Sequence, residues 1–340
     1  MKKIEELEKD LNNGILENIY FLYGEEQYLL DTIANKIKKL FGECIKGINY
    51  ILIDDTNINN IISDIETPAF GYEKKLIIVK NSGILKKEGK RKNAELTKIK
   101  EKLNTYLKEN IEIIKQSVII VFIEEETDTK QELYKTIEKL GIICKFDFQN
   151  LLQLQKRLKV ICNSYGVKIS DNNLKYFIEC AGTNMQNLIN EIRKLIEYKG
   201  KGEEILKEDI DKLTIKQLES VIFDLTDNLG KKETTKALEV LKNLINQKEP
   251  LQKILITLYN HFKKIYITKL SEKYGKQITL SLQLKPNQVF LVNKYKMQSK
   301  YFKEQDLKGI LQDLRDLDYN YKNGLIDLQI GLESILCRYC

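Results

Sequence analysis

The chain has 340 residues, of which 42% are hydrophobic and 31% are charged, and its formal net charge is +7. This length exceeds that of one typical domain, and the composition is that of a folded protein of two or three domains rather than a disordered one. The longest apolar run, residues 118–123, suits a buried strand and is too short to cross a bilayer, and the N-terminal segment MKKIEELEKD lacks the apolar centre of a secretory signal. We therefore expect a cytoplasmic protein without a membrane partner.

The cysteine and histidine patterns predict neither a metal site nor a catalytic centre. The six cysteines are scattered, and only Cys337 and Cys340 have a paired spacing, so no zinc site is expected. The single histidine, His261, lies in a helical run without a carboxylate or nucleophile pattern around it, which favours a structural role. The positive net charge permits contact with nucleic acid but does not require it.

Strand and helix patterns alternate through residues 1–148. The expected strands are IYFLY (19–23), INYILID (48–54), LIIVK (76–80), SVIIVFIEE (117–125) and GIICKFDF (141–148). The expected helices span residues 25–41, 58–66, 94–110 and 130–140. Short apolar strands separated by helices predict an α/β fold with a parallel sheet covered on both faces.

After residue 148 the pattern is helical. Residues 149–213 predict a small helical domain, in which Ser170 or Asp171 caps one helix, Thr183 or Asn184 caps the next, and Asp209 caps or enters the last. Residues 214–340 predict an all-α domain with helices over 219–229, 237–245 and 251–270, and one long final helix from about residue 305. We expect three domains.

The stretch IYFLYGEEQYLLDTIANKI (19–37) has the strand, turn and helix of a phosphate-binding loop. However, Leu30 and Asp31 stand where the lysine and the hydroxyl residue of such a loop belong, and two acids that repel phosphate follow Gly24. The strand at 76–80 ends in Lys80, where P-loop ATPases carry the carboxylates that hold magnesium. The residues therefore predict no bound ATP, no metal and no catalytic group.

The stretch ETPAFGYEKKLIIV (66–79) is the second candidate site. Thr67 and Pro68 end a helix, and Phe70 lies outside both the helical and the strand periods. Phe70 either folds back onto the core of its domain or is an exposed aromatic residue that enters a pocket of a partner. The sequence pattern alone leaves both interpretations open.

Two basic stretches are candidates for contact with nucleic acid. Residues 80–108 hold ten lysines and arginines against three acids, and residues 294–303 combine lysines with aromatic residues. Either could meet phosphates, although a solvated face is the commoner reason for such a charge run.

Several stretches resemble the delta subunit of the bacterial DNA polymerase III clamp loader, a relative of AAA+ ATPases. They are YFLYGEEQYLL, ETPAFGYEKKLIIVKN, AGTNMQNLINEIRKLIEY, VIFDLTDNLGKKETTKALEVLKNLI and LDYNYKNG, and the resemblance spans nearly the whole chain. It implies an AAA+-like domain (1–148), a helical lid domain (149–213) and an all-α collar domain (214–340) that joins five subunits. It also implies a lost ATP site, because the arginine of the lid in ATP-hydrolysing relatives falls at Met185, in addition to the changes around Gly24 and at Lys80.

The resemblance implies a subunit of a DNA-directed DNA polymerase, a nucleotidyltransferase, that is not catalytic by itself and needs no cofactor. It would bind and open the beta sliding clamp for loading onto primed DNA, together with gamma/tau and delta-prime subunits in a hetero-pentamer. The matching clamp-binding positions are Thr67, Pro68, Ala69 and Phe70, with Phe70 as the anchor. Ala69 departs from the usual pair of bulky residues. Because full burial of one Phe contributes roughly 1.5–3 kcal/mol, a missing neighbour weakens the contact or is offset elsewhere.

The sequence leaves open one contact with DNA and two alternative functions. Family members touch the template strand with an aromatic residue of the collar, but the matching stretch around residues 324–326 has none, and Tyr319 and Tyr321 stand nearby without aligning. A divergent AAA+ ATPase is one alternative function. A stand-alone DNA-binding protein that uses the basic stretches is the other.

Overall fold

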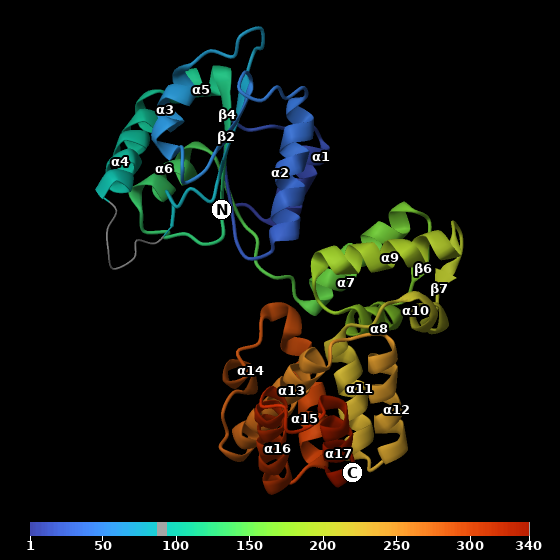
Figure 1. Ribbon diagram of the computed structural model, residues 1–340. Coiled ribbons are helices and arrows are strands. Elements are labelled where there is room, and N and C mark those ends of the chain that lie inside the picture. The colour runs from blue at the N-terminus through green and yellow to red at the C-terminus, as the bar shows by residue number, and fades with distance from the viewer. Residues whose placement is uncertain (87–93, 340) are drawn as a thin grey trace. The chain divides into compact units, whose positions relative to one another are not determined.

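The computed structural model describes residues 1–86 and 94–339, and the chain forms two compact units, Met1–Phe148 and Gln149–Cys340 (Figure 1). The boundary lies where the strand patterns of the sequence end. A further division of the second unit into a lid and a collar near residue 213 stays a prediction. In the described ranges, no helix has both the length and the apolar character needed to span a membrane.

The first unit is built on a five-stranded parallel sheet. Its strands are β1 (Ile19–Tyr23), β2 (Tyr50–Ile53), β3 (Lys75–Lys80), β4 (Val118–Glu124) and β5 (Ile142–Lys145), in the order β2-β3-β4-β1-β5. Phe21 of β1 is opposite Phe122 of β4 and Ile143 of β5. The connection after β1 leads to β2 at one edge of the sheet, and the connection after β4 leads to β5 at the other edge. The carboxyl end of β1 therefore lies at a topological switch point, where α/β proteins bind ligands.

Helices cover both faces of this sheet, as the alternating pattern predicts (Figure 1). One face carries α1 (Ile4–Asn12) and α2 (Gln27–Phe41), and the other carries a 3₁₀ turn (Ile58–Asn60), α3 (Ile61–Glu66), α4 (Ala94–Glu109), α5 (Ile111–Ser117) and α6 (Glu132–Leu140). Every residue of β1 and β4 is buried. This burial explains why the strands show continuous apolar runs instead of alternation. The short helices α1 and α5 were not expected from the sequence.

The second unit begins with α7 (Leu151–Ser164), α8 (Asp171–Ala181), α9 (Met185–Lys199) and α10 (Lys207–Leu213). Ser170 and Asn184 are the N-caps of α8 and α9, and each side chain accepts a hydrogen bond from a backbone N–H three residues later. Asp209 lies within the first turn of α10 and accepts from the N–H of Leu206. One expectation was wrong: strands do not stop at residue 148, because β6 (Lys168–Ile169) and β7 (Glu204–Ile205) form a parallel pair. Two-residue strands are too short to give a periodic pattern.

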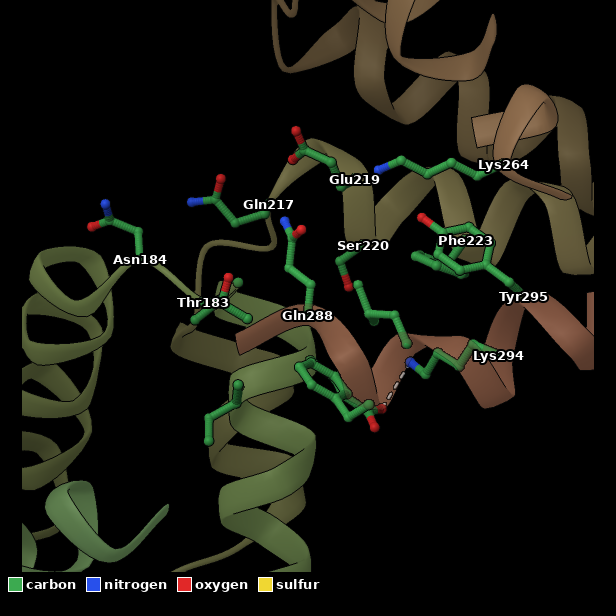
Figure 2. A pocket seen from close by; sticks show the side chains of 16 residues that line it. Thr183, Asn184, Gln217, Glu219, Ser220, Phe223, Lys264, Gln288, Lys294 and Tyr295 are labelled. Carbon is green, nitrogen blue, oxygen red and sulfur yellow. Dashed lines mark ion pairs between the residues drawn. The ribbon is translucent and has the colours of Figure 1, made fainter. Parts of the chain in front are cut away.

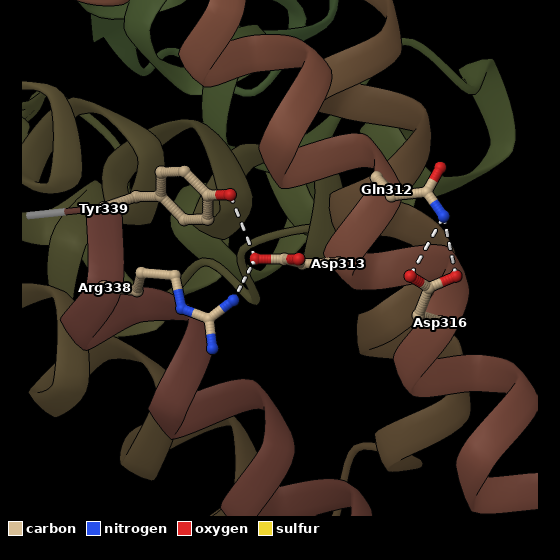
Figure 3. A network of polar contacts seen from close by, with 5 residues as sticks. All are labelled: Gln312, Asp313, Asp316, Arg338 and Tyr339. Atoms are coloured by element: carbon tan, nitrogen blue, oxygen red, sulfur yellow. Dashed lines mark hydrogen bonds and ion pairs between the residues drawn. The ribbon is translucent and has the colours of Figure 1, made fainter.

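The remaining elements of this unit are α11 (Leu218–Gly230), α12 (Thr234–Asn246), α13 (Leu251–Lys273), α14 (Ile278–Ser281), a 3₁₀ turn (Pro286–Leu291), α15 (Val292–Tyr301), α16 (Glu304–Lys322) and α17 (Leu328–Tyr339). The sequence predicted one long final helix, but the structure has two, α16 and α17. The helix is interrupted at Gly324, which adopts φ +71°. A polar network then ties the two together (Figure 3). Asp313 on α16 accepts hydrogen bonds from Arg338 at 2.7 Å and from the Tyr339 hydroxyl at 2.9 Å, both on α17.

Candidate functional site

Phe70 is the most exposed aromatic side chain of the first unit, with 79% of its surface accessible. It lies in the segment that joins α3 to β3, residues 67–74, which we call the Phe70 loop. Thr67 and Pro68 are exposed as well, and Ala69 is half-buried. Phe70 therefore does not fold back onto the core of its domain, and its side chain is accessible to a partner.

The Phe70 loop is held at both ends. Where α3 ends, the ammonium group of Lys75 donates to the backbone carbonyl oxygens of Asp64, at 2.6 Å, and of Thr67. Toward β3, the N–H of Tyr72 donates to the carbonyl oxygen of Ala69 at 3.0 Å, and the Tyr72 hydroxyl donates to Glu43 at 3.2 Å. Sequence reasoning missed Lys75 and Tyr72, because a lysine beside a strand gives no sign that its side chain is buried.

The turn after β1 does not form a phosphate cradle. The N–H of Gly24 donates to the carbonyl oxygen of Glu124 at 3.1 Å, and the N–H of Glu26 donates to that of Phe146 at 3.0 Å. A Cβ on Gly24 would lie 2.2 Å from the carbonyl oxygen of Phe146. Gly24 is thus required for close approach of two backbone segments, and two N–H groups of the turn already have protein acceptors.

The other positions of the expected lost ATP site are occupied by internal contacts. Lys80, at the end of β3, forms an ion pair with Asp31 on α2, with 2.9 Å between Nζ and Oδ1. Leu30 is fully buried, and Met185 at the start of α9 is buried in the second unit. The structure brings Lys80 and Asp31 together, whereas Leu30 and Met185 serve hydrophobic cores. Leu30 and Met185 present no group that complements a phosphate, and the ammonium group of Lys80 is already paired with a carboxylate.

The basic stretches differ in what they expose. Within residues 80–108, positions 87–93 lie outside the described residues, and Lys98, Lys102 and Lys108 are exposed on α4. In the second stretch, Tyr295 and Phe302 are buried in the helical core and so are not free to stack on bases. In the helical unit, Tyr319 is exposed and Tyr321 packs against the core.

His261 and three of the cysteines are buried in the folded chain. His261 is buried and its Nε2 donates to Oε1 of Gln298 at 2.7 Å. Burial lowers the pKa of His261 to about 3, so the ring is neutral near pH 7. Cys144, Cys162 and Cys180 are buried. Among the described residues, no three His, Cys, Asp or Glu side chains gather closely enough to hold a metal ion.

A cavity of about 290 Å³ lies in the second unit (Figure 2). The charged residues that line it are two lysines and two glutamates, so their formal charges cancel: Lys264, Lys294, Glu179 and Glu219. Lys294 forms an ion pair with Glu179 at 2.8 Å. Burial lowers the pKa of the second lysine, Lys264, although Glu219 opposes this shift. Because opposite charges are paired or adjacent, the cavity favours neither an anion nor a cation.

Comparison with known proteins identifies the family. The family model "DNA polymerase III, delta subunit" matches residues 20–147, and "DNA polymerase III delta subunit, C-terminal domain" matches residues 219–339. "DNA polymerase III subunit delta" of Bacillus subtilis (strain 168) is 27% identical over 336 residues, which cover 97% of this chain and 95% of that protein. "Probable DNA polymerase III subunit delta" of Aquifex aeolicus (strain VF5) is 28% identical over 318 residues, with coverage of 89% and 85%.

Among solved structures, the "Bacillus subtilis DNA clamp loader delta protein (YqeN)" superimposes with a TM-score of 0.76 at 25% identity and 99% coverage of both chains. This likeness confirms the expected fold class, an AAA+-like parallel-sheet domain followed by a mainly helical part. The chain belongs to the DNA polymerase III delta subunit family, and it is therefore part of a DNA polymerase complex.

Proposed function

We propose that this chain binds the beta sliding clamp through Phe70 and holds the ring open for loading onto primed DNA. The observation that carries this proposal is the 79% exposure of the Phe70 side chain on a loop anchored at both ends. An exposed aromatic residue on a pre-ordered loop is typical of an interface hot spot, since little conformational entropy is lost on binding. Thr67, Pro68 and Ala69 form the rest of the contact.

The energy of this contact is modest. Burial of the Phe70 ring contributes roughly 1.5–3 kcal/mol, and Ala69 adds little apolar area. Clamp opening then follows from tighter binding to the open form of the ring than to the closed form, because a ligand shifts an equilibrium only by its difference in affinity for the two states. This mechanism requires no bond chemistry in the chain itself.

ATP is used by other subunits in this proposal. The engaged N–H groups of the turn after β1, the Lys80–Asp31 ion pair and the buried Leu30 support a chain that binds no nucleotide and catalyses no reaction by itself. Gamma/tau and delta-prime subunits would complete a hetero-pentamer through the helical domain, which serves as a collar. Primed DNA would be bound within that cytoplasmic complex.

A pull-down of the beta clamp with the full-length chain tests the proposal. Phe70→Ala should lose most clamp binding, because the anchor is removed from an otherwise small contact. Leu152→Ala is the matched control, since Leu152 on α7 is 76% exposed and is not part of the proposed contact. If Phe70→Ala retains full binding, the assignment of the clamp-binding residues is wrong.

The alternative of a stand-alone DNA-binding protein makes a different prediction. It requires tight binding of DNA by the isolated chain, with an affinity that falls steeply with salt. Of the three aromatic residues in the second basic stretch, Tyr295 and Phe302 are buried, which leaves only Tyr301, 36% exposed, for stacking of bases. A fluorescence titration of single-stranded DNA with the isolated chain at two salt concentrations separates the two functions.

A further inference from the structure

Lys75 is buried, although nothing in the sequence predicts the burial of this lysine. Only 3% of its surface is accessible. It is the first residue of β3, and the alternation of side chains along a strand places it on the same face as Ile77 and Val79. That face of the sheet shares a hydrophobic core with Ile61 and Ile65 of α3. The ammonium group is therefore directed toward the end of α3 and away from solvent.

The hydrogen-bond acceptors of Lys75 lie on both sides of the end of α3. Asp64 is within the helix, and Thr67 is its C-cap residue with an extended backbone. The last carbonyl oxygens of a helix have no partner within the helix and carry its negative dipole end, so a cation satisfies them well. Hydrogen bonds to a charged donor are stronger than neutral ones. A six-residue helix is too short to define its own end firmly.

We propose that Lys75 is a positioning residue that fixes the base of the Phe70 loop in the arrangement that the clamp binds. Thr67 precedes Phe70 by only three residues, so a fixed Thr67 carbonyl restricts where Phe70 can point. This inference rests on the proposed function, since it assigns a role in clamp binding to a residue that does not itself contact the clamp. Burial lowers the pKa of Lys75 from its ordinary value, as expected for an ammonium group desolvated between main-chain oxygens.

The neighbouring lysine provides a matched control. Lys74 is only half-buried, and its ammonium group donates to the carbonyl oxygen of Lys115, at 3.3 Å, instead of to the end of α3. Lys74→Met and Lys75→Met remove the same charge from adjacent positions. Only the second substitution releases the carbonyl oxygens of Asp64 and Thr67.

The first experiment measures the order of the loop without the clamp. The chain contains no tryptophan, so Phe70→Trp introduces a single indole fluorophore at an exposed position. In this background, Lys75→Met should add a nanosecond depolarisation of the indole fluorescence, the time range of loop motion. Lys74, four residues after Phe70, makes only the weaker contact with the Lys115 carbonyl oxygen, so Lys74→Met should change the anisotropy decay much less than Lys75→Met. Circular dichroism verifies the fold of each variant, and if Lys75→Met does not fold, Lys75→Gln, which keeps a shorter donor, takes its place.

The second experiment measures clamp affinity in the chain with Phe70 present. Loss of the hydrogen bonds lowers the fraction of molecules in which the Phe70 loop has the conformation that the clamp binds. If this fraction falls to about a tenth, the apparent Kd for the clamp rises about tenfold. Lys75→Arg should restore most of the affinity, because a guanidinium can donate to both carbonyl oxygens. A role in apolar packing alone predicts the reverse order, in which the unbranched Met is tolerated and the larger Arg is not.

The outcomes distinguish this inference from the proposed function. If Phe70→Ala keeps clamp binding, the proposed function fails whatever Lys75 does to the loop. If Phe70→Ala loses clamp binding while Lys75→Met keeps both the affinity and the anisotropy decay of the parent chain, the positioning role of Lys75 is overturned.

Discussion

Lys80 at the end of β3 and Asp31 on α2 form an ion pair, with 2.9 Å between Nζ and Oδ1. Both side chains are about half exposed, so the pair adds little to stability. Its position matters more than its energy. In P-loop ATPases a magnesium-binding carboxylate stands at the end of the corresponding strand, whereas here an ammonium group occupies that place.

We therefore expect no binding of ATP and magnesium to the isolated chain. Lys80→Asp should not create binding either, because the N–H groups of Gly24 and Glu26 remain engaged and no lysine stands at Leu30. Isothermal titration calorimetry of the wild type and of Lys80→Asp measures this. Micromolar affinity in the wild type would show that a divergent ATP site exists.

Gly24→Ala should destabilise the first unit by about 3 kcal/mol, from backbone strain together with steric overlap. The new Cβ would lie 2.2 Å from the carbonyl oxygen of Phe146, and the residue has φ +139°. Steric overlap and backbone strain therefore both lower the stability of the variant. Gly14→Ala is the control, since Gly14 also has a positive φ but nothing lies within 4 Å of the new Cβ. That variant should cost only about 1–2 kcal/mol. Urea unfolding measures both, and equal costs would refute the role of Gly24 in close backbone approach.

Ala69→Leu should strengthen clamp binding. A leucine beside Phe70 adds apolar area to the proposed contact, and a gain of about 1.4 kcal/mol corresponds to a tenfold lower Kd. Surface plasmon resonance with the immobilised clamp measures the change. The double variant Ala69→Leu, Phe70→Ala should not gain affinity, because the anchor is absent. An unchanged Kd for Ala69→Leu would mean that position 69 does not face the clamp.

His261 should make stability depend on pH between 7 and 5. Burial lowers its pKa from an ordinary 6.5 to about 3, so below pH 6.5 the unfolded chain binds a proton that the folded chain does not. The stability that the neutral ring contributes is therefore present above pH 6.5 and is lost as the pH falls. By linkage the loss is about 2 kcal/mol between pH 7 and pH 5.

The control for this effect is His261→Gln, which removes the only histidine of the chain. Urea unfolding at the two pH values gives the free energy of unfolding for both proteins. The wild type should lose about 2 kcal/mol more than the variant. Parallel pH dependences would show that the ring is protonated or solvated in the folded chain.

Local features of this protein were predictable because their causes are local. The apolar runs of β1 and β4 and the helix caps depend on residues a few positions apart. The structure has the runs where the sequence predicts them, and Ser170 and Asn184 are each one of the two cap candidates that the sequence offered. The absence of phosphate-binding residue types from the turn after β1 was also readable, since it concerns which side chains are present. The break at Gly324 was missed, because the flanking residues continue a helical period.

The sequence by itself determined the alternation of strands and helices in the first unit, the mainly helical character of the second, and the residue types present in the turn after β1. Only the tertiary structure decided the exposure of Phe70, the burial of Lys75 beneath α3, and the approach of Gly24 to Phe146. The physical reason is that each depends on segments brought together by the order of strands in the sheet. A lysine at the start of a strand and a phenylalanine in a loop carry no local sign of which one the folded chain buries.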